Sequence, residues 1–479
     1  MKHFFSLFAA LLLFGAIAGA KVKMPSVFSD NMVLQQQTEV ALWGTASGKN
    51  VTISASWAPD KEVVAAVKRG KWTASLATPA AGGPYELKVS DGEELVLKNV
   101  LIGEVWFCSG QSNMSMPLRG FVSQPVQGAA EVIVSAKPSV PIRMCFVKRR
   151  PAVVPEEDCE CSWKENTPDV VALTSATAYF FAKRLQETLD VPIGIINSDW
   201  GGTPIESWMS REAIENGFEG EFDLAFLDQD KLPEFKPHRK PCTLFNGMVA
   251  PLVPYTFRGM IWYQGEANRS KPELYTRMQT AYVKMMREVF QNPDAPFYFV
   301  QIAPYAYYGD TQKFTSGYFY EAQQKTLEFI PHSGMAPTVD LGEEGTIHPC
   351  RKKEVGDRLA FLALADTYGM IGIDPHAPTY KSVSFKGSEA VVTFVSGKQG
   401  LAPMGRDLGG FEIAGPDRVF HPAKARVLER FTVSVSSDEV SDPVAVRYCF
   451  RNWGMGTLYN AFGIPALPFR TDDWDDLEK

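Results

Sequence analysis

The chain contains one stretch in which an apolar strand runs directly into a serine-bearing turn: Gly103-Glu104-Val105-Trp106-Phe107-Cys108-Ser109-Gly110-Gln111-Ser112-Asn113-Met114. The glycine-containing turn would place Ser112 at the carboxyl end of the strand, where open α/β sheets bind their ligands. Ser112 is therefore a candidate nucleophile. The alternative is a serine whose hydroxyl only caps the helix that follows.

The sequence on the carboxyl side of this stretch alternates between apolar strands and amphipathic helices. The pattern predicts helices and strands at residues 174–189, 193–196, 274–289, 297–302 and 318–330, then a strand that ends near Asp340 and a last helix that begins near Pro349. Helices of this length can cross over between parallel strands. We therefore expect an α/β domain with a parallel sheet at residues 101–374.

Shorter strand patterns lie on both sides of this region. Runs at 38–43, 51–57, 72–76 and 85–89, separated by turn residues, predict a small N-terminal β domain at residues 21–100. Runs at 391–395, 431–435 and 444–450 predict a C-terminal β domain at residues 375–479. The sequence shows no repeat of fixed period.

Residues 1–20 have the pattern of a signal peptide. A short basic start is followed by an apolar run over residues 4–17 and by the small residues Ala18-Gly19-Ala20, where signal peptidase would cut. No later stretch has the length of apolar sequence that a membrane span needs. We expect an exported protein, periplasmic or secreted, with no membrane anchor after cleavage.

The charge balance and the cysteines exclude several classes of function. Lys and Arg number 48 against 55 Asp and Glu, so the net charge of -7 offers no broad basic surface for nucleic acid. The seven cysteines are sparse and odd in number, and none has the usual spacing of zinc ligands, so we expect no metal site. Neither the disulfide pairing nor the oligomeric state follows from the sequence.

A serine nucleophile needs a base, and His348 is the histidine in a suitable place. It lies between the strand that ends near Asp340 and the last predicted helix, so it belongs at the same sheet edge as Ser112. Histidine is the usual proton shuttle at neutral pH. The alternative is a histidine held at a helix start by a structural hydrogen bond.

Two further strand ends carry groups that could stabilise an oxyanion. Residues 197–203 include the Gly201-Gly202 pair, whose amides are donors, and residues 262–268 include the uncharged side chain of Gln264. Either segment alone could be a simple turn. A serine, glycine amides, a carboxamide and a histidine at four successive strand ends together indicate acyl transfer.

These four blocks resemble the sialate O-acetylesterase family, which is a group of SGNH-type carbohydrate esterases. The resemblance rests on residues 110–114, 200–204, 261–266 and 347–349, and it extends to 27–34 and 410–415, so it spans nearly the whole mature chain. It implies a flavodoxin-like SGNH hydrolase domain flanked by β-sandwich-like domains. It also implies removal of O-acetyl groups from sugars without a metal or other cofactor.

The resemblance leaves the group that orients the histidine open. SGNH hydrolases usually carry an acid three residues before the histidine, where this chain has Gly345. Asp340 is our preferred acid, and Glu343 and Glu344 are alternatives. If none of them serves, a backbone carbonyl would orient His348 and leave a Ser-His dyad. The oxyanion would bind the amides of Ser112 and Gly202 and the side chain of Gln264, although SGNH enzymes have asparagine at the last of these places.

Several residues near the blocks are candidates for sugar binding. A sialic acid carries a carboxylate, which an arginine would bind. The candidates are polar or aromatic residues, which could equally be structural, and three arginines close to the catalytic positions: Trp200, Asn246, Glu266, Asn268, Arg119, Arg269 and Arg351. The alternatives to sialate are an acetylxylan or other polysaccharide deacetylase, or a non-catalytic carbohydrate-binding protein, against which Ser112 and His348 weigh.

Overall fold

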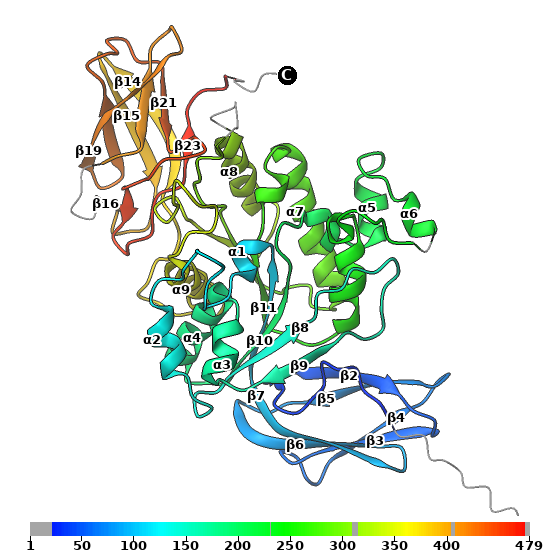
Figure 1. Cartoon of the computed structure of the whole chain (residues 1–479). Coiled ribbons are helices and arrows are strands. Elements are labelled where there is room, and N and C mark those ends of the chain that lie inside the picture. The colour runs from blue at the N-terminus through cyan, green and yellow to red at the C-terminus, as the bar shows by residue number, and fades with distance from the viewer. Residues whose placement is uncertain (1–21, 230, 309–314, 404–407, 475–479) are drawn as a thin grey trace, which may run out of the picture.

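A computed structural model of the chain describes residues 22–229, 231–308, 315–403 and 408–474. The predicted signal peptide lies outside the described residues. Figure 1 shows N-terminal strands at one end of the molecule, a sheet covered by helices in the centre, and C-terminal strands at the other end.

The central sheet has the strand order β13-β12-β11-β7-β10-β8-β9. All neighbours in this path are parallel except β8 and β9, which are antiparallel at one edge. Apart from β8 and β9, the strands follow the flavodoxin-like order 2-1-3-4-5, which confirms the predicted α/β class. The strands span Glu94–Gly110 (β7), Ile142–Val147 (β8), Cys161–Lys164 (β9), Ile193–Asp199 (β10), Gly259–Tyr263 (β11), Phe297–Val300 (β12) and Ser333–Ala336 (β13).

Strand β7 is buried on both faces because its apolar side chains alternate between two cores. Val105 and Phe107 belong to one core, and Trp106 and Cys108 belong to the other. The first core includes side chains from α7 and α8, and the second includes side chains from α4 and α9. These helices span Pro272–Val289 (α7), Thr315–Lys325 (α8), Ala176–Leu189 (α4) and Lys352–Leu362 (α9).

The N-terminal strands continue into the central sheet through β7. Strand β6 pairs with the first part of β7, whereas β10 and β11 pair with its second part. The predicted domain limit at residue 100 thus falls inside β7, and the domain limits stay predictions. The strands span Val33–Gln35 (β1), Glu39–Thr45 (β2), Asn50–Ala55 (β3), Glu62–Ala66 (β4), Lys71–Ala77 (β5) and Gly82–Ser90 (β6).

The C-terminal strands form two antiparallel four-stranded sheets, β14-β15-β20-β19 and β18-β17-β21-β23, around one core. Their alternating apolar residues explain why the sequence predicts strands here. The first sheet contains Thr379–Lys386 (β14), Glu389–Val395 (β15), Thr432–Ser436 (β20) and Lys424–Glu429 (β19). The second contains Phe420–Pro422 (β18), Phe411–Ala414 (β17), Ala445–Tyr448 (β21) and Phe469–Arg470 (β23).

The remaining α-helices and strands are short. They are α1 (Ser112–Ser115), α2 (Ala129–Ser135), α3 (Pro168–Leu173), α5 (Arg211–Gly217), α6 (Ala225–Asp228), β16 (Leu401–Ala402) and β22 (Tyr459–Asn460). Within the described ranges, no helix is both long and apolar enough to cross a membrane. All seven cysteines lie in these ranges as free thiols, and five of them are buried.

Candidate active site

Close packing of two strand ends positions Ser112. Gly110 has φ +144°, and a Cβ at this residue would lie 2.2 Å from the carbonyl oxygen of Tyr263, so the end of β7 can meet the end of β11 only with glycine there. The amide of Gln111 then donates to the Tyr263 carbonyl at 2.9 Å. The chain turns at this point, and Ser112 begins α1 at the carboxyl edge of the sheet.

Ser112 and His348 lie in direct contact although 236 residues separate them. The Ser112 hydroxyl donates to His348 Nε2 at 2.8 Å. On the other side of the ring, His348 Nδ1 lies 2.9 Å from Gln124 Oε1. The structure therefore brings together the two candidate catalytic residues, and it adds a third side chain that the sequence analysis misses, the neutral amide of Gln124.

The hydrogen bonds around Gln124 define the tautomer of His348. The backbone amide of His348 donates to Thr346 Oγ1, and the Nε2 amide of Gln124 donates to the same oxygen. This leaves the carbonyl oxygen of Gln124 facing the ring, so Nδ1 carries the proton and donates it. Nε2 of His348 therefore keeps its lone pair directed at Ser112, which is the form that a general base needs.

A tight loop brings Gln124 to the histidine. Gly120 has φ +79°, and the backbones of Phe121 and Gln124 exchange two hydrogen bonds, so the loop closes on itself. Phe121 packs its ring against His348 in an edge-on contact with centroids 5.2 Å apart. One loop thus fixes the imidazole by packing and by a hydrogen bond.

The surroundings of His348 keep its imidazole neutral. Burial lowers the pKa of His348 to about 4, and the positive charge of Lys352 acts in the same direction. At pH 7 the ring is therefore unprotonated and can accept a proton from Ser112.

Asp340, our preferred acid, does not contact His348. Its two carboxylate oxygens each accept a hydrogen bond from the guanidinium of Arg358 at 2.7 Å, and Tyr459 donates to one of them at 3.3 Å. The alternative Glu343 accepts from the backbone amide of Cys350 at 2.6 Å. The preference for Asp340 as the orienting acid is wrong because its carboxylate neutralises a buried arginine instead.

We expect Asp340→Asn to lower stability much more than catalysis. The side chains of Asp340 and Arg358 are 7% and 8% exposed, so the substitution leaves a guanidinium buried without its counter-charge, at a cost of about 3–5 kcal/mol. Urea denaturation measures this loss, and kcat at a temperature where both forms are folded measures catalysis. Asp438→Asn, which removes an exposed pair with Lys424, is the control. A loss of kcat as large as that of His348→Ala, with unchanged stability, would contradict this interpretation.

The side chain of Gln264 also faces the protein rather than the site. It is fully buried, and its Nε2 donates to Gln111 Oε1, to the Thr203 carbonyl and to Asn268 Oδ1 at 2.8–3.2 Å. An amide nitrogen has two protons, so none remains for an oxyanion. The predicted oxyanion role of Gln264 is therefore wrong, and this side chain joins the turns after β7, β10 and β11.

The glycine pair after β10 does lie beside the serine. Trp200 donates its amide to the Gly110 carbonyl at 3.1 Å, which aligns the end of β10 with the end of β7. A Cβ at Gly201 would lie only 3.3 Å from the Ser112 Cβ. Gly202 follows with φ +71°, a conformation that glycine adopts readily. The backbone of this turn is thus held close to Ser112.

The two asparagine candidates for sugar binding form internal hydrogen bonds. Asn246 donates to the carbonyls of Ala152 and Val153. Asn268 accepts from the amide of Ile205 and donates to a carboxylate oxygen of Glu206. Their side-chain amides hold the surrounding loops in place.

Glu266 points inward as well. Its Oε1 accepts from the side-chain amide of Asn113 at 2.6 Å, and its Oε2 is buried. Burial raises the pKa of the Glu266 carboxyl, while Asn113 and the charge of Lys352 act against that rise. The carboxylate belongs to the interior beneath Ser112.

Two of the three arginines have protein partners, whereas Arg119 is exposed. Arg269 stacks over the ring of Tyr307 at 3.7 Å, and Arg351 donates to Glu354 and to the Asp340 carbonyl. Arg119 is exposed two residues before Phe121, whose ring packs on His348. Arg119 is therefore the best placed of the three for an anionic ligand.

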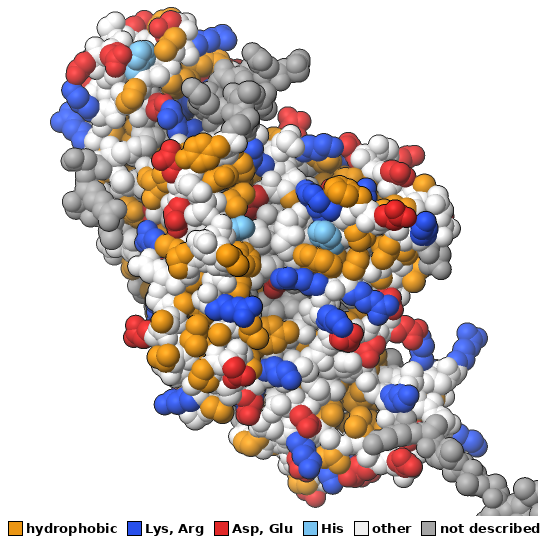
Figure 2. Space-filling view, viewed as in Figure 1, with side chains coloured by type: hydrophobic (Ala, Val, Ile, Leu, Met, Phe, Trp, Pro, Cys, Tyr) orange, Lys and Arg blue, Asp and Glu red, His pale blue; other side chains and the backbone are white. Residues whose placement is uncertain are grey.

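Trp200 lies half-buried at the turn after β10. Its indole stacks on the imidazole of His238 with centroids 4.7 Å apart and an interplanar angle of 8°. Figure 2 shows Lys and Arg side chains gathered over the middle of the face that carries α1 and β8. Arg149 and Arg150, which follow β8, are both about half exposed or more, and Arg149 pairs with Asp199 at the end of β10.

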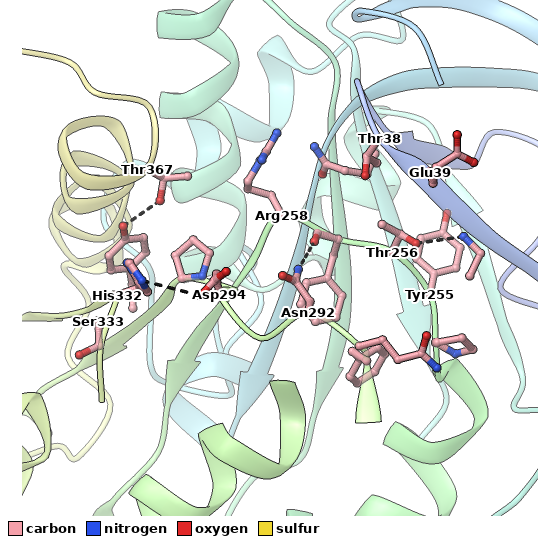
Figure 3. Close-up of a pocket in the computed structure, with 18 of the residues that line it drawn as sticks. Thr38, Glu39, Tyr255, Thr256, Arg258, Asn292, Asp294, His332, Ser333 and Thr367 are labelled. Carbon is pink, nitrogen blue, oxygen red and sulfur yellow. Dashed lines mark hydrogen bonds and ion pairs between the residues drawn. The ribbon is translucent and has the colours of Figure 1, made fainter. Parts of the chain in front are cut away.

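A groove of about 1170 Å³ lies at the other edge of the sheet, away from this chemistry. Figure 3 shows Thr38, Arg258, Asn292 and His332 around it, where the N-terminal strands meet the amino ends of β11 and β12. Neither Ser112 nor His348 lines it. The contact between Ser112 and His348, and not the size of a cavity, therefore locates the candidate site. In the described part of the chain, no group of three or more His, Cys, Asp or Glu side chains could hold a metal ion.

Comparison with known proteins shows the family of the chain. The family model described as carbohydrate esterase, sialic acid-specific acetylesterase, matches residues 102–364. The chain belongs to this family.

Similar proteins match this sialic acid-specific acetylesterase family member over nearly all of its length. It is 28% identical to the sialate O-acetylesterase of Mus musculus, with 94% of each chain covered, and 27% identical to that of Homo sapiens, with 94% of this chain and 93% of the relative covered. A solved carbohydrate acetylesterase from Xanthomonas citri is 34% identical, with 95% of this chain and 100% of that chain covered and a TM-score of 0.84. The predicted family is confirmed, and the protein is a carbohydrate O-acetylesterase.

Two residues of the esterase site escape the sequence analysis. Gln124 lies 12 residues after Ser112 in a loop without a recognisable motif, and a glutamine has no general association with a base. Lys352 follows His348 by four residues, and its sequence context resembles the solvated start of a helix. The position next to the histidine block is the only signal that could have drawn attention to Lys352.

Proposed function

We propose that this esterase removes O-acetyl groups from sialic acids or related acetylated glycans through an acyl-enzyme formed on Ser112. The contact of 2.8 Å between the Ser112 hydroxyl and His348 Nε2 carries the proposal, because a serine is a weak nucleophile without an adjacent base. The mechanism needs no cofactor: each step moves one proton between His348 and an oxygen atom.

In the first half of the reaction, His348 Nε2 takes the hydroxyl proton of Ser112 while Oγ attacks the acetyl carbonyl carbon. The negative charge on the carbonyl oxygen is stabilised by the backbone amides of Ser112 and Gly202. Collapse breaks the bond to the sugar oxygen, which receives the proton from Nε2. The sugar leaves with a free hydroxyl, and the acetyl group stays on Ser112.

In the second half, water replaces the sugar. His348 Nε2 takes a proton from water while the oxygen of water attacks the acetyl-serine carbonyl. The tetrahedral intermediate releases Ser112 Oγ, which recovers the proton from His348, and acetate leaves. Throughout, Gln124 accepts the Nδ1 hydrogen bond and keeps the ring in one orientation.

The substrate side of the proposal rests on charge. The relatives named sialate O-acetylesterases act on a sugar with a carboxylate, and Arg119 offers an exposed guanidinium beside the loop that packs on His348. Arg149 and Arg150 add positive charge on the face that carries α1 and β8. These groups favour an acidic sugar over a neutral one.

We expect a higher kcat/KM for 9-O-acetyl sialic acid than for an acetylated xylooligosaccharide. Arg119→Ala is expected to lower the first value by about tenfold, which corresponds to one exposed charge-assisted contact of about 1.4 kcal/mol, and to leave the second nearly unchanged. Arg69→Ala, at an exposed turn of the N-terminal strands, is the control. A wild-type preference for the neutral sugar would replace the sialate proposal with a polysaccharide deacetylase and leave the esterase mechanism in place.

We also propose that the enzyme acts outside the cytoplasm, in the periplasm or in the medium. The proposal depends on the signal pattern of residues 1–20, which predicts a mature chain starting at Lys21. N-terminal sequencing of the protein from fractionated cells tests it. A cytoplasmic chain that keeps Met1 would contradict it.

A further inference from the structure

A lysine is buried directly beneath the catalytic pair. Lys352 lies at the start of α9, four residues after His348, and its side chain is fully buried. Its ammonium donates to Asn113 Oδ1 at 2.5 Å and lies 5.5 Å from the centre of the Tyr263 ring. Burying an ammonium costs free energy, and a lysine whose side chain pointed to solvent would avoid this cost. The buried position therefore calls for a role that an exposed lysine could not fill.

The partner of this lysine connects it to the reacting groups. Asn113 follows Ser112 in α1, and its side-chain amide donates to Glu266 Oε1 at 2.6 Å and to the Ile347 carbonyl at 3.0 Å. Ile347 precedes His348. The side-chain nitrogen of Asn113 thus bonds both to the backbone just before His348 and to the turn after β11, while Lys352 donates to its side-chain oxygen.

The lysine also orients Asn113. If the amide were rotated by 180°, its nitrogen would face the ammonium and its oxygen would face both the Ile347 carbonyl and the Glu266 carboxylate, so three favourable contacts would become repulsive. The charge of Lys352 on Asn113 Oδ1 selects the observed orientation. In this orientation the amide pulls the Ile347–His348 backbone toward the serine turn.

We propose that Lys352 is a positioning residue of the Ser112–His348 pair, and that it acts through Asn113 by holding the nucleophile turn, the Glu266 turn and the histidine segment in one arrangement. This inference rests on the proposed acyl-enzyme mechanism. Lys352 does not touch the reacting atoms, so its removal should change the alignment of the base more than the binding of substrate.

The charges around Lys352 add a consequence for pH. Glu266, Glu343 and the thiol of Cys350 face it and favour its charged form, whereas burial lowers its pKa to about 7. Glu266 in turn faces Tyr263, among other phenols. Below pH 7 the ammonium is charged, and its charge contributes to the low pKa of His348. Loss of this charge should therefore raise the pKa of His348 and move the acid limb of kcat/KM to higher pH.

The test compares Lys352→Met with Lys353→Met. Methionine has similar length without charge, and Lys353 is the next residue of α9, exposed and paired with Asp357. With 4-nitrophenyl acetate we expect Lys352→Met to lower kcat by about 10- to 100-fold with KM within about threefold, as a small misplacement of a base does. The acid limb should move upward from about pH 4 and stay below the ordinary range of histidine, because burial, the larger cause of the low pKa of His348, remains in the variant. Lys353→Met should match the wild type in both.

The double variant Lys352→Met/Glu266→Gln addresses the fold. Lys352→Met alone leaves the buried Glu266 carboxylate without this counter-charge, and Glu266→Gln removes that carboxylate. The double variant should therefore fold even if the single variant does not. We expect its kcat to stay low and its acid limb to stay shifted. Wild-type kcat and an unshifted limb in either folded variant would overturn the proposal, as would a loss of activity that only follows the folded fraction. Activity in Ser112→Ala would instead overturn the proposed mechanism itself, so the two failures are distinguishable.

Discussion

Replacement of Ser112 by alanine is expected to lower kcat/KM for an acetyl ester by roughly 10⁴- to 10⁶-fold, which is the range for loss of a serine nucleophile. No neighbouring group can substitute for it: the hydroxyl of Ser115, one turn later, donates to Asp199 at 2.5 Å. Release of acetate from 4-nitrophenyl acetate, followed over hours at high enzyme concentration, measures the residual activity of the variant.

The same substitution should leave the fold unchanged. Ser112 forms no side-chain cap of α1, because the N-cap is Gln111 and it makes no side-chain cap bond. The melting temperature of Ser112→Ala should therefore equal that of Ser135→Ala, which removes a hydroxyl from the exposed end of α2. Retained turnover would refute the nucleophile, and a large fall in melting temperature would show that the hydroxyl is structural.

Replacement of His348 by alanine is expected to lower kcat by about 10⁴-fold, and Gln124→Leu by about 10²-fold. The difference arises because leucine leaves the base in place and removes only the two hydrogen bonds of the Gln124 side chain, to His348 Nδ1 and to Thr346 Oγ1. In Gln124→Glu the added carboxylate should raise the pKa of His348 above its value of about 4. The histidine then loses its neutral form as the pH falls through a higher value, so the acid limb of kcat/KM should move to higher pH.

The pH profiles of these variants separate orientation from general damage. Gln127→Leu, three residues later in the same segment, is the control because only its backbone amide has a described bond, to the Cys350 carbonyl. Equal losses for Gln124→Leu and His348→Ala would mean that the amide takes part in the chemistry itself. A Gln124→Glu profile identical to that of the wild type would show that this side chain does not face the ring in solution.

The sequence predicts the fold and the proximity of Ser112 and His348 because their signals are local. The apolar run of β7 and the alternation of helices and strands define the sheet, and strand ends in such a sheet meet at one edge. Ser112 comes two residues after β7, His348 lies in the segment between β13 and α9, and each belongs to a motif. These two facts suffice to bring them together without any knowledge of side-chain direction.

The partners of the pair depend on side-chain direction, which the sequence does not contain. Asp340 lies eight residues before His348 at a plausible distance, yet its carboxylate faces Arg358 on α9. Gln264 lies in the right turn, yet its amide faces inward. Gln124 is far from any block, and only the closed loop at Gly120 brings it to the ring. Proximity to a motif thus predicts the neighbourhood of a residue and leaves its partner undefined.

Strand β7 has a consequence for how this enzyme can be divided. Its 17 residues begin among the N-terminal strands and end at Gly110, two residues before Ser112. The strands that pair with β7 change along its length, from β6 to β10, without a break in β7 itself. A fragment that starts at residue 101 would cut a continuous strand and leave the backbone groups of residues 101–103, which pair with β1 and at Ile102 with β6, without partners. The N-terminal strands and the segment that carries Ser112 are therefore parts of one structural unit. Recombination within the gene would preserve β7 only if it exchanged both parts together.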